Sequence, residues 1–153
     1  MLRKIINVCF ILIVFMFLLS FINKKNNNIK LIIPSINLNY NIRKNQSNFN
    51  NLNSSLVYFN NIDPNNKIII FGHSMMGKGV LFNRIDELKN NDICYLYINK
   101  NKYKYFVNNI YLVNKNKVQL LDEEKDSKKL ILITCSKKYK NKRLIVELLQ
   151  KCW

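Results

Sequence analysis

Three residues whose side chains together support cysteine-dependent acyl transfer lie at the ends of apolar segments of this chain. Cys135 ends the apolar part of Leu130 to Ser136, His73 follows the apolar segment 67–71, and Arg143 opens the run Arg-Leu-Ile-Val. A thiol with an ordinary pKa of about 8.5 holds little thiolate at neutral pH. Histidine, here the only one in the chain, can share the thiol proton and later protonate a leaving amine. Since arginine can stabilise the oxyanion of a tetrahedral intermediate, the three residues predict nucleophilic acyl transfer.

Cys135 has an alternative interpretation as one more small, buried hydrophobic residue, the usual state of a free cysteine. Its run, Leu-Ile-Leu-Ile-Thr-Cys-Ser, is short, rich in isoleucine and followed by basic residues, which is typical of a buried strand. Cys135 is therefore expected where strand becomes loop, held by a scaffold and open to substrate. The histidine and arginine at other strand ends favour a nucleophile over a core residue.

The order of these motifs resembles that of sortases, the membrane-anchored cysteine transpeptidases of Gram-positive surfaces. The motifs are a histidine in Gly-His-Ser, a Thr-Cys closing an apolar strand, and an arginine opening the next strand. The resemblance runs from about Ile29 to Leu149. It implies a closed eight-stranded β-barrel in which the cysteine strand lies beside those of the histidine and the arginine. A groove between these strands would take a sorting signal such as Leu-Pro-x-Thr-Gly.

The resemblance also implies a role for each residue of the site. Cys135 would attack the threonine carbonyl of the sorting signal and hold the acyl group as a thioester, His73 would protonate the departing amine, and Arg143 would position the substrate and stabilise the oxyanion. Thr134 and Ser136 are assigned to substrate binding, with the N–H of Ser136 as a second oxyanion donor. No cofactor is required. Some members bind calcium through clustered acids, but no such cluster precedes the histidine strand, so no metal is expected.

Other functions use parts of the same pattern. A papain-like peptidase would place its cysteine before its histidine, and an L,D-transpeptidase would have the two close together in sequence. A cysteine endopeptidase that only hydrolyses remains open, because it would be built of the same parts. A membrane-anchored, non-enzymatic β-barrel binding module also remains open, although it would not need the three residues together.

The N-terminal segment is interpreted as a membrane anchor over residues 1–25, with the catalytic barrel over 26–153. Arg3 and Lys4 precede an apolar run from Ile5 to Ile22, which is just long enough to cross a bilayer core of about 30 Å. A cleaved signal peptide is the competitor, but no Ala-x-Ala-like site follows the run. The expectation is a single-pass protein of the cell membrane with its catalytic domain outside. Its partners would be surface proteins with a C-terminal sorting signal and a cell-wall precursor amine as acceptor.

The charge and the remaining cysteines are weaker signals. The formal net charge is +16, from 25 Lys+Arg against 9 Asp+Glu, but the lysines are scattered among asparagines and isoleucines, so no nucleic-acid partner is expected. One interpretation of the charge is attraction to anionic wall polymers or lipid headgroups, and the other is a compositional bias with no function.

Cys94 lies in a strand pattern and is expected in the core or on a sheet face. No Cys-x-x-Cys metal spacing occurs.

An all-β architecture follows from many short strand patterns with few helical ones. A short linker after the anchor and the lack of a second apolar segment favour a housekeeping role over pilus polymerisation. Strands are expected at Leu31 to Ile36, Leu38 to Arg43, Leu56 to Phe59, Lys67 to His73, Asp92 to Ile98, Tyr103 to Val113, Leu130 to Ser136 and Arg143 to Leu149. The connections are expected to be a hairpin connection at Asn99 to Lys102, helical turns in Leu81 to Leu88, a loop or short helix at Asn45 to Asn53 and a loop at Met75 to Gly79.

Overall fold

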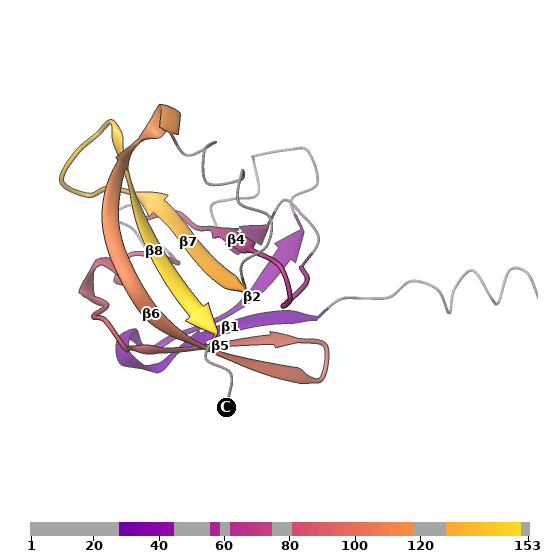
Figure 1. Cartoon of the computed structure of the whole chain (residues 1–153). Coiled ribbons are helices and arrows are strands. Elements are labelled where there is room, and N and C mark those ends of the chain that lie inside the picture. Colours follow the sequence, from indigo (N-terminus) through magenta and orange to yellow (C-terminus); the bar gives the residue numbers. More distant parts are fainter. Residues whose placement is uncertain (1–27, 45–55, 59–61, 75–80, 118–127, 151–153) are drawn as a thin grey trace, which may run out of the picture.

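Eight strands close into one barrel in the computed structural model, which describes residues 28–44, 56–58, 62–74, 81–117 and 128–150 (Figure 1). Around the barrel the strands follow the order β1-β2-β3-β4-β7-β8-β6-β5. This confirms the all-β, eight-stranded closed barrel expected from the sequence. The elements are β1 (Ile29–Ile33), η1 (Pro34–Ile36), β2 (Leu38–Lys44), β3 (Leu56–Tyr58), β4 (Ile68–Phe71), η3 (Ile85–Glu87), β5 (Ile93–Ile98), β6 (Asn101–Asn114), β7 (Lys129–Cys135) and β8 (Lys142–Gln150).

Alternation along β7 and β8 divides their side chains between the barrel interior and its outer face. Leu130 and Leu132 of β7 pack in the main core with Val146 and Leu148 of β8. The intervening residues form a second, smaller apolar cluster, the outer-face cluster. Its members come from four neighbouring strands and are Ile69, Phe71, Tyr111, Val113, Ile131, Ile133 and Ile145. The strand that carries the cysteine is thus covered on both faces, which explains why its sequence is apolar without interruption.

Two short connections depend on asparagine in the left-handed region. β5 and β6 pair as an antiparallel hairpin with Ile98 opposite Asn101, and Asn99 in the turn has φ 57°. The connection is therefore shorter than the predicted stretch from Asn99 to Lys102. Asn37, which follows η1, has φ 53°. Asparagine adopts this conformation more readily than other residues with a side chain, so both turns suit their sequences.

The histidine strand ends at Phe71, two residues before the predicted end, and the next residue, Gly72, occupies a crowded position. A Cβ atom on Gly72 would lie 2.5 Å from Cδ2 of Phe82 and 2.6 Å from Cδ2 of Leu56. Both of those side chains are fully buried in the core. Glycine therefore lets the backbone pass close to packed side chains immediately before the histidine.

Several predicted segments lie outside the described residues. These are the anchor at 1–25, the polar stretch Asn45 to Asn53 and the loop Met75 to Gly79. Of the residues that the structure does describe, none belongs to a helix long and apolar enough to cross a membrane.

Gly72→Ala is expected to destabilise the protein, because the added methyl group must displace Phe82 or Leu56. Overpacking of this kind typically costs about 1–3 kcal/mol of unfolding free energy. Chemical unfolding of the full chain in detergent measures it, with Asn39→Ala on exposed β2 as the control. Equal unfolding free energies for the two variants would contradict the close packing inferred at Gly72.

Candidate active site

Cys135 is the last residue of β7, at the position where the strand opens into a loop. Its side chain is partly exposed, whereas Leu130 to Thr134 before it are all buried. By alternation its side chain shares the outer face of the barrel with Ile131 and Ile133. The predicted setting, a cysteine held by a rigid strand and open at its edge, is what the structure has.

Strand register brings the predicted partners level with this cysteine. Arg143 of β8 lies directly opposite Cys135 in the antiparallel β7–β8 pair. On the other side, β4 runs parallel to β7 with Phe71 paired to Ile133. β4 ends at Phe71, so His73 follows the paired part of the strand by two residues, at the end where Cys135 closes β7. Since neighbouring strands carry them, the three residues gather at one edge of the sheet.

Two side-chain hydroxyl groups form hydrogen bonds between the histidine segment and the cysteine strand, one donated from each segment. Thr134 Oγ1 donates to the carbonyl of Gly72 at 2.7 Å, and Ser74 Oγ donates to the carbonyl of Cys135. Both side chains are buried. The two bonds bracket His73 in sequence, so they fix where its backbone runs relative to the nucleophile. Backbone bonds add to them, since the N–H of Gly72 donates to Ile133 and the N–H of Phe82 donates to the carbonyl of His73.

The three predicted catalytic side chains are all partly exposed. The Arg143 guanidinium donates to the carbonyl of Lys142 at 3.3 Å. Within the described part of the chain, no carboxylate forms an ion pair with Arg143. Its positive charge is therefore not neutralised by those acids and can act on an anionic group brought to Cys135.

Ser136 has a different role from the one predicted for it. Its backbone N–H donates to the carbonyl of Lys142 at 3.1 Å, and its Oγ accepts from the N–H of Tyr139 at 3.1 Å. Both groups close the connection between β7 and β8. The N–H of Ser136 is consequently occupied and does not point to an oxyanion, which corrects the expectation of a second donor there.

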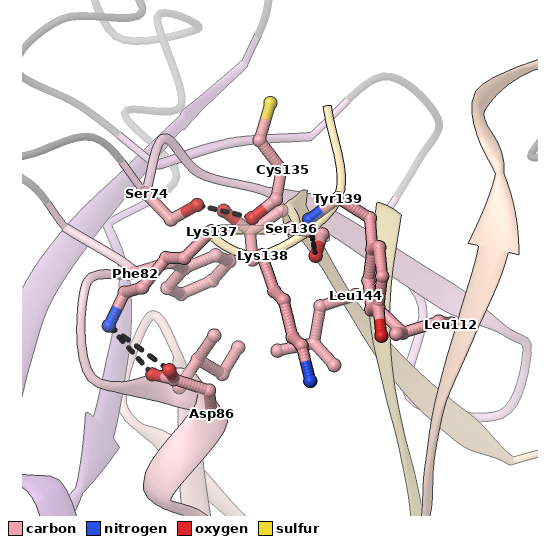
Figure 2. Close-up of a pocket in the computed structure, with 12 residues that line it drawn as sticks. Ser74, Phe82, Asp86, Leu112, Cys135, Ser136, Lys137, Lys138, Tyr139 and Leu144 are labelled. Carbon is pink, nitrogen blue, oxygen red and sulfur yellow. Dashed lines mark hydrogen bonds and ion pairs between the residues drawn. The ribbon is translucent and has the colours of Figure 1, made fainter. Parts of the chain in front are cut away.

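A pocket of about 190 Å³ adjoins Cys135 on the side of the β7–β8 connection. Figure 2 shows the Cys135 thiol pointing away from the side chains that fill this region, so the cysteine borders the pocket mainly through its backbone. Lys137 bridges to Asp86 across its wall at 2.9 Å. The lining is otherwise largely apolar and comprises Ser74, Phe82, Ile85, Asp86, Leu112, Thr134, Cys135, Ser136, Lys137, Lys138, Tyr139 and Leu144.

Comparison with known proteins agrees with this geometry. The model of the sortase domain matches residues 31–149. The chain belongs to the sortase family. Sortase A of Bacillus anthracis is 34% identical over 119 residues, covering 76% of this chain and 56% of that protein. The chain thus aligns with little more than half the length of that relative.

Solved sortase structures share the barrel. The Listeria monocytogenes sortase A structure superposes with a TM-score of 0.73 at 23% identity, covering 82% of this chain and 88% of that one. A Clostridium perfringens sortase C structure described with the C-terminal cell wall sorting motif gives 0.69 at 26% identity, covering 81% and 70%. Similarity extends to both sortase A and sortase C structures, so it does not choose between a housekeeping and a pilus-type enzyme.

The other described cysteine of this sortase is unsuited to nucleophilic chemistry. Cys94 of β5 has no exposed surface. Its burial raises the pKa of the thiol well above the ordinary value. Cys94 therefore stays protonated in the core, as the sequence predicted for a core or sheet-face residue.

The residue that sequence reasoning missed is Ser74. It was noted only as part of the Gly-His-Ser motif, yet its buried hydroxyl bonds to the carbonyl of the nucleophile. A serine directly after the histidine was the available signal. Thr134, which was predicted to bind substrate, lines the pocket, but its hydroxyl is engaged with Gly72, so the structure gives it a positioning role.

Thr134→Val is expected to lower the unfolding free energy by about 1–3 kcal/mol, because it leaves the buried Gly72 carbonyl without this donor. Thr134→Ser, which keeps the hydroxyl, should retain most of that bond. Denaturant titrations of both variants, with hydrogen exchange at the Gly72 N–H, measure the effect. A valine variant as stable as the serine variant, with unchanged exchange, would mean that the bond contributes nothing.

Proposed function

We propose that this chain is a sortase-type cysteine transpeptidase that cleaves an LPxTG-like sorting signal and transfers the acyl group to a cell-wall amine. The observation that supports the proposal is the pairing of β4, β7 and β8, in which Cys135 lies opposite Arg143 and His73 follows the end of parallel β4. A binding module of the same fold would need no such convergence of a thiol, an imidazole and a guanidinium. Family membership supports the same chemistry.

The border of the outer-face cluster is the proposed docking surface for the sorting signal, because its central residues Ile131, Ile133 and Ile145 are buried. The cluster runs along β4, β7, β8 and β6 and ends at Cys135 and Arg143. Phe71 and Tyr111 at its border are partly exposed, so they offer contact area to the apolar leucine and proline of such a signal. A peptide lying there would bring its threonine carbonyl to the thiol, which shares that face.

In the first half-reaction the Cys135 thiolate attacks the threonine carbonyl carbon, and the resulting oxyanion is stabilised by the guanidinium of Arg143. The Thr–Gly bond then breaks as His73 donates a proton to the departing amine, which leaves a thioester on Cys135. In the second half-reaction His73 accepts a proton from the incoming amine. The amine forms a new amide bond and the thiol is regenerated.

The anchor completes the proposal. Residues 1–25 would hold the barrel, residues 26–153, at the outer surface of the cell membrane, where lipid-linked precursors carry free amines. Surface proteins with a C-terminal sorting signal would be the acyl donors. No nucleic acid, metal or other cofactor has a part in this scheme.

The full chain in detergent should form a thioester with a sorting-signal peptide, and added amine should speed turnover and appear in the product. An amine is a far better nucleophile towards a thioester than water is, so oligoglycine or a diamino-acid peptide should outcompete hydrolysis. Mass spectrometry of the trapped adduct and chromatography of the products measure both steps.

Cys135→Ala is the matched control and should give neither adduct nor product. An adduct on Cys94 would overturn the assignment of the nucleophile. Equal rates with and without amine, with only the hydrolysed acid formed, would make the protein a membrane-bound endopeptidase. Full cellular function in the Cys135→Ala strain would instead point to a non-enzymatic binding module.

His73→Ala and Arg143→Ala should both fold but turn over poorly, and for different reasons. Loss of the histidine removes the proton donor, a contribution of about 10²–10⁴-fold in rate. Loss of the arginine removes an oxyanion contact worth about 10²–10³-fold. Pre-steady-state acylation with a peptide that has a good leaving group should rescue the histidine variant more than the arginine variant. Circular dichroism showing an unfolded Arg143→Ala protein would assign that residue to structure instead.

A further inference from the structure

The β5–β6 hairpin carries a cluster of lysine and aromatic side chains far from the active-site pocket. Lys102 Nζ lies 3.9 Å from the ring centroid of Tyr95 and 5.9 Å from that of Tyr97, and Lys104 Nζ lies 4.9 Å from the ring of Phe106. We call these five residues the hairpin surface. Such contacts hold each ammonium over an aromatic face, within the range of about 6 Å in which the attraction operates.

Register shows that the hairpin surface faces out of the barrel. Cys94 and Leu96 of β5 and Tyr105 and Val107 of β6 are buried in the core. The residues that alternate with them are therefore directed outward. In the next strand, Lys30 lies opposite Tyr97, which extends the same basic and aromatic face onto β1.

The strands on this side of the barrel contain no acidic residue, although Asp92, directly before β5, accepts from Ser35 and from the N–H of Lys89. No Asp or Glu occurs in β1, β2, β5 or β6, and these four strands are contiguous in the barrel order. Carboxylates in these strands therefore cannot neutralise the lysines of the hairpin surface. A face of this composition suits an anionic, amphipathic partner.

The hairpin turn lies where the chain leaves the proposed anchor. The N–H of Asn99 donates to the carbonyl of Asn28 at 2.8 Å, and Ile29 pairs with Ile98. Figure 1 shows the start of β1 beside the end of the β5–β6 hairpin. Only residues 23–27 separate Asn28 from the apolar run that ends at Ile22. Fully extended, that connection spans at most roughly 20 Å at about 3.5 Å per residue.

We propose that the hairpin surface is a membrane-docking surface that binds the anionic phospholipid headgroups of the bilayer holding the anchor. The inference rests on the membrane anchor of the proposed function but not on the proposed transpeptidation reaction. The short connection keeps the hairpin close to the lipid, the lysines supply the opposite charge, and Tyr95, Tyr97 and Phe106 are the kind of side chain that settles at a membrane interface.

Docking there also sets where the reaction takes place. β6 runs from the hairpin turn to Val113, which pairs with Arg143 in the active site. At about 3.3 Å per residue, the strand from Asn101 to Val113 reaches roughly 40 Å. The docked barrel would therefore hold Cys135 away from the lipid surface and towards the cell wall.

The test uses the full chain in nanodiscs of phosphatidylcholine, with or without phosphatidylglycerol, each containing a trace of lipid with a photoreactive diazirine on its headgroup. After irradiation and cleavage by a protease that does not cut at lysine, mass spectrometry measures labelling of residues 93–106. We expect stronger labelling in anionic discs, weakened by high salt. Lys102→Glu with Lys104→Glu should reduce it about fivefold or more, the factor expected for one lysine near an anionic surface.

Lys115→Glu with Lys117→Glu is the matched control, because it reverses the same charge at the same spacing beyond the opposite end of β6. It should leave labelling of the hairpin unchanged. Lys102→Gln with Lys104→Gln removes the two charges without reversing them, so it is less liable to misfold. It should give a loss of hairpin labelling intermediate between the native chain and the doubly reversed variant. Circular dichroism of each variant checks the barrel.

Equal labelling of the hairpin in neutral and anionic discs would overturn the inference. So would a loss of labelling in the Lys115→Glu, Lys117→Glu variant without a loss in the Lys102→Glu, Lys104→Glu variant. Because labelling needs no turnover, an active chain with an unlabelled hairpin refutes the docking surface and leaves the proposed enzyme intact. A chain that does not enter nanodiscs at all would refute both the anchor and the docking surface.

Discussion

The parallel pairing of β4 with β7 is the constraint on which the site depends. Because both strands run in the same direction, the residues that follow β4 and the last residue of β7 emerge at the same edge of the sheet. An antiparallel pair would have separated His73 from Cys135 by the length of a strand. Parallel strands also need a long crossover, and here β5 and β6 form part of it. These intervening strands account for the long sequence separation of the histidine and the cysteine.

Register within that pair is fixed by chemistry on both faces of β7. Thr134 points inward and donates to the carbonyl of Gly72, while Cys135 lies on the outer face with Ile131 and Ile133. A slip of one residue would exchange the faces of every side chain. It would put the threonine hydroxyl on the apolar outer-face cluster and bury the thiol in the core. Burial there raises the pKa of a thiol, as it does for Cys94, so the cysteine would stay protonated. The same hydrogen bond that stabilises the strand pair therefore also keeps the nucleophile accessible.

Much of this could be predicted from the sequence, because apolar runs bounded by polar residues mark β4, β5, β7 and β8 with little ambiguity. The parts that could not be predicted depend on contacts between distant segments. The requirement for glycine at position 72 comes from Phe82 and Leu56, which pack against it from other segments of the chain. Ser136 donates its N–H to Lys142, a bond that exists only once β7 and β8 have paired. Ser74 is ordinary as a residue type and becomes a positioning residue only through the carbonyl of Cys135.

The fold also changes what the net charge means. In sequence the lysines look evenly scattered, which favours compositional bias. Most of the acids in the described part of the chain interact locally, as in the ion pairs of Glu87 with Arg84, Asp86 with Lys137 and Glu147 with Lys129. The two exposed pairs, those of Glu87 and Asp86, contribute little to stability, but all three pairs cancel charge where they occur. β2, β1, β5 and β6 are neighbours in the barrel and hold no acids, so the basic residues of this side have no acidic neighbour within these four strands. Closure of the barrel thus brings four acid-free strands together, and the field of their basic side chains acts over about 10 Å at moderate ionic strength.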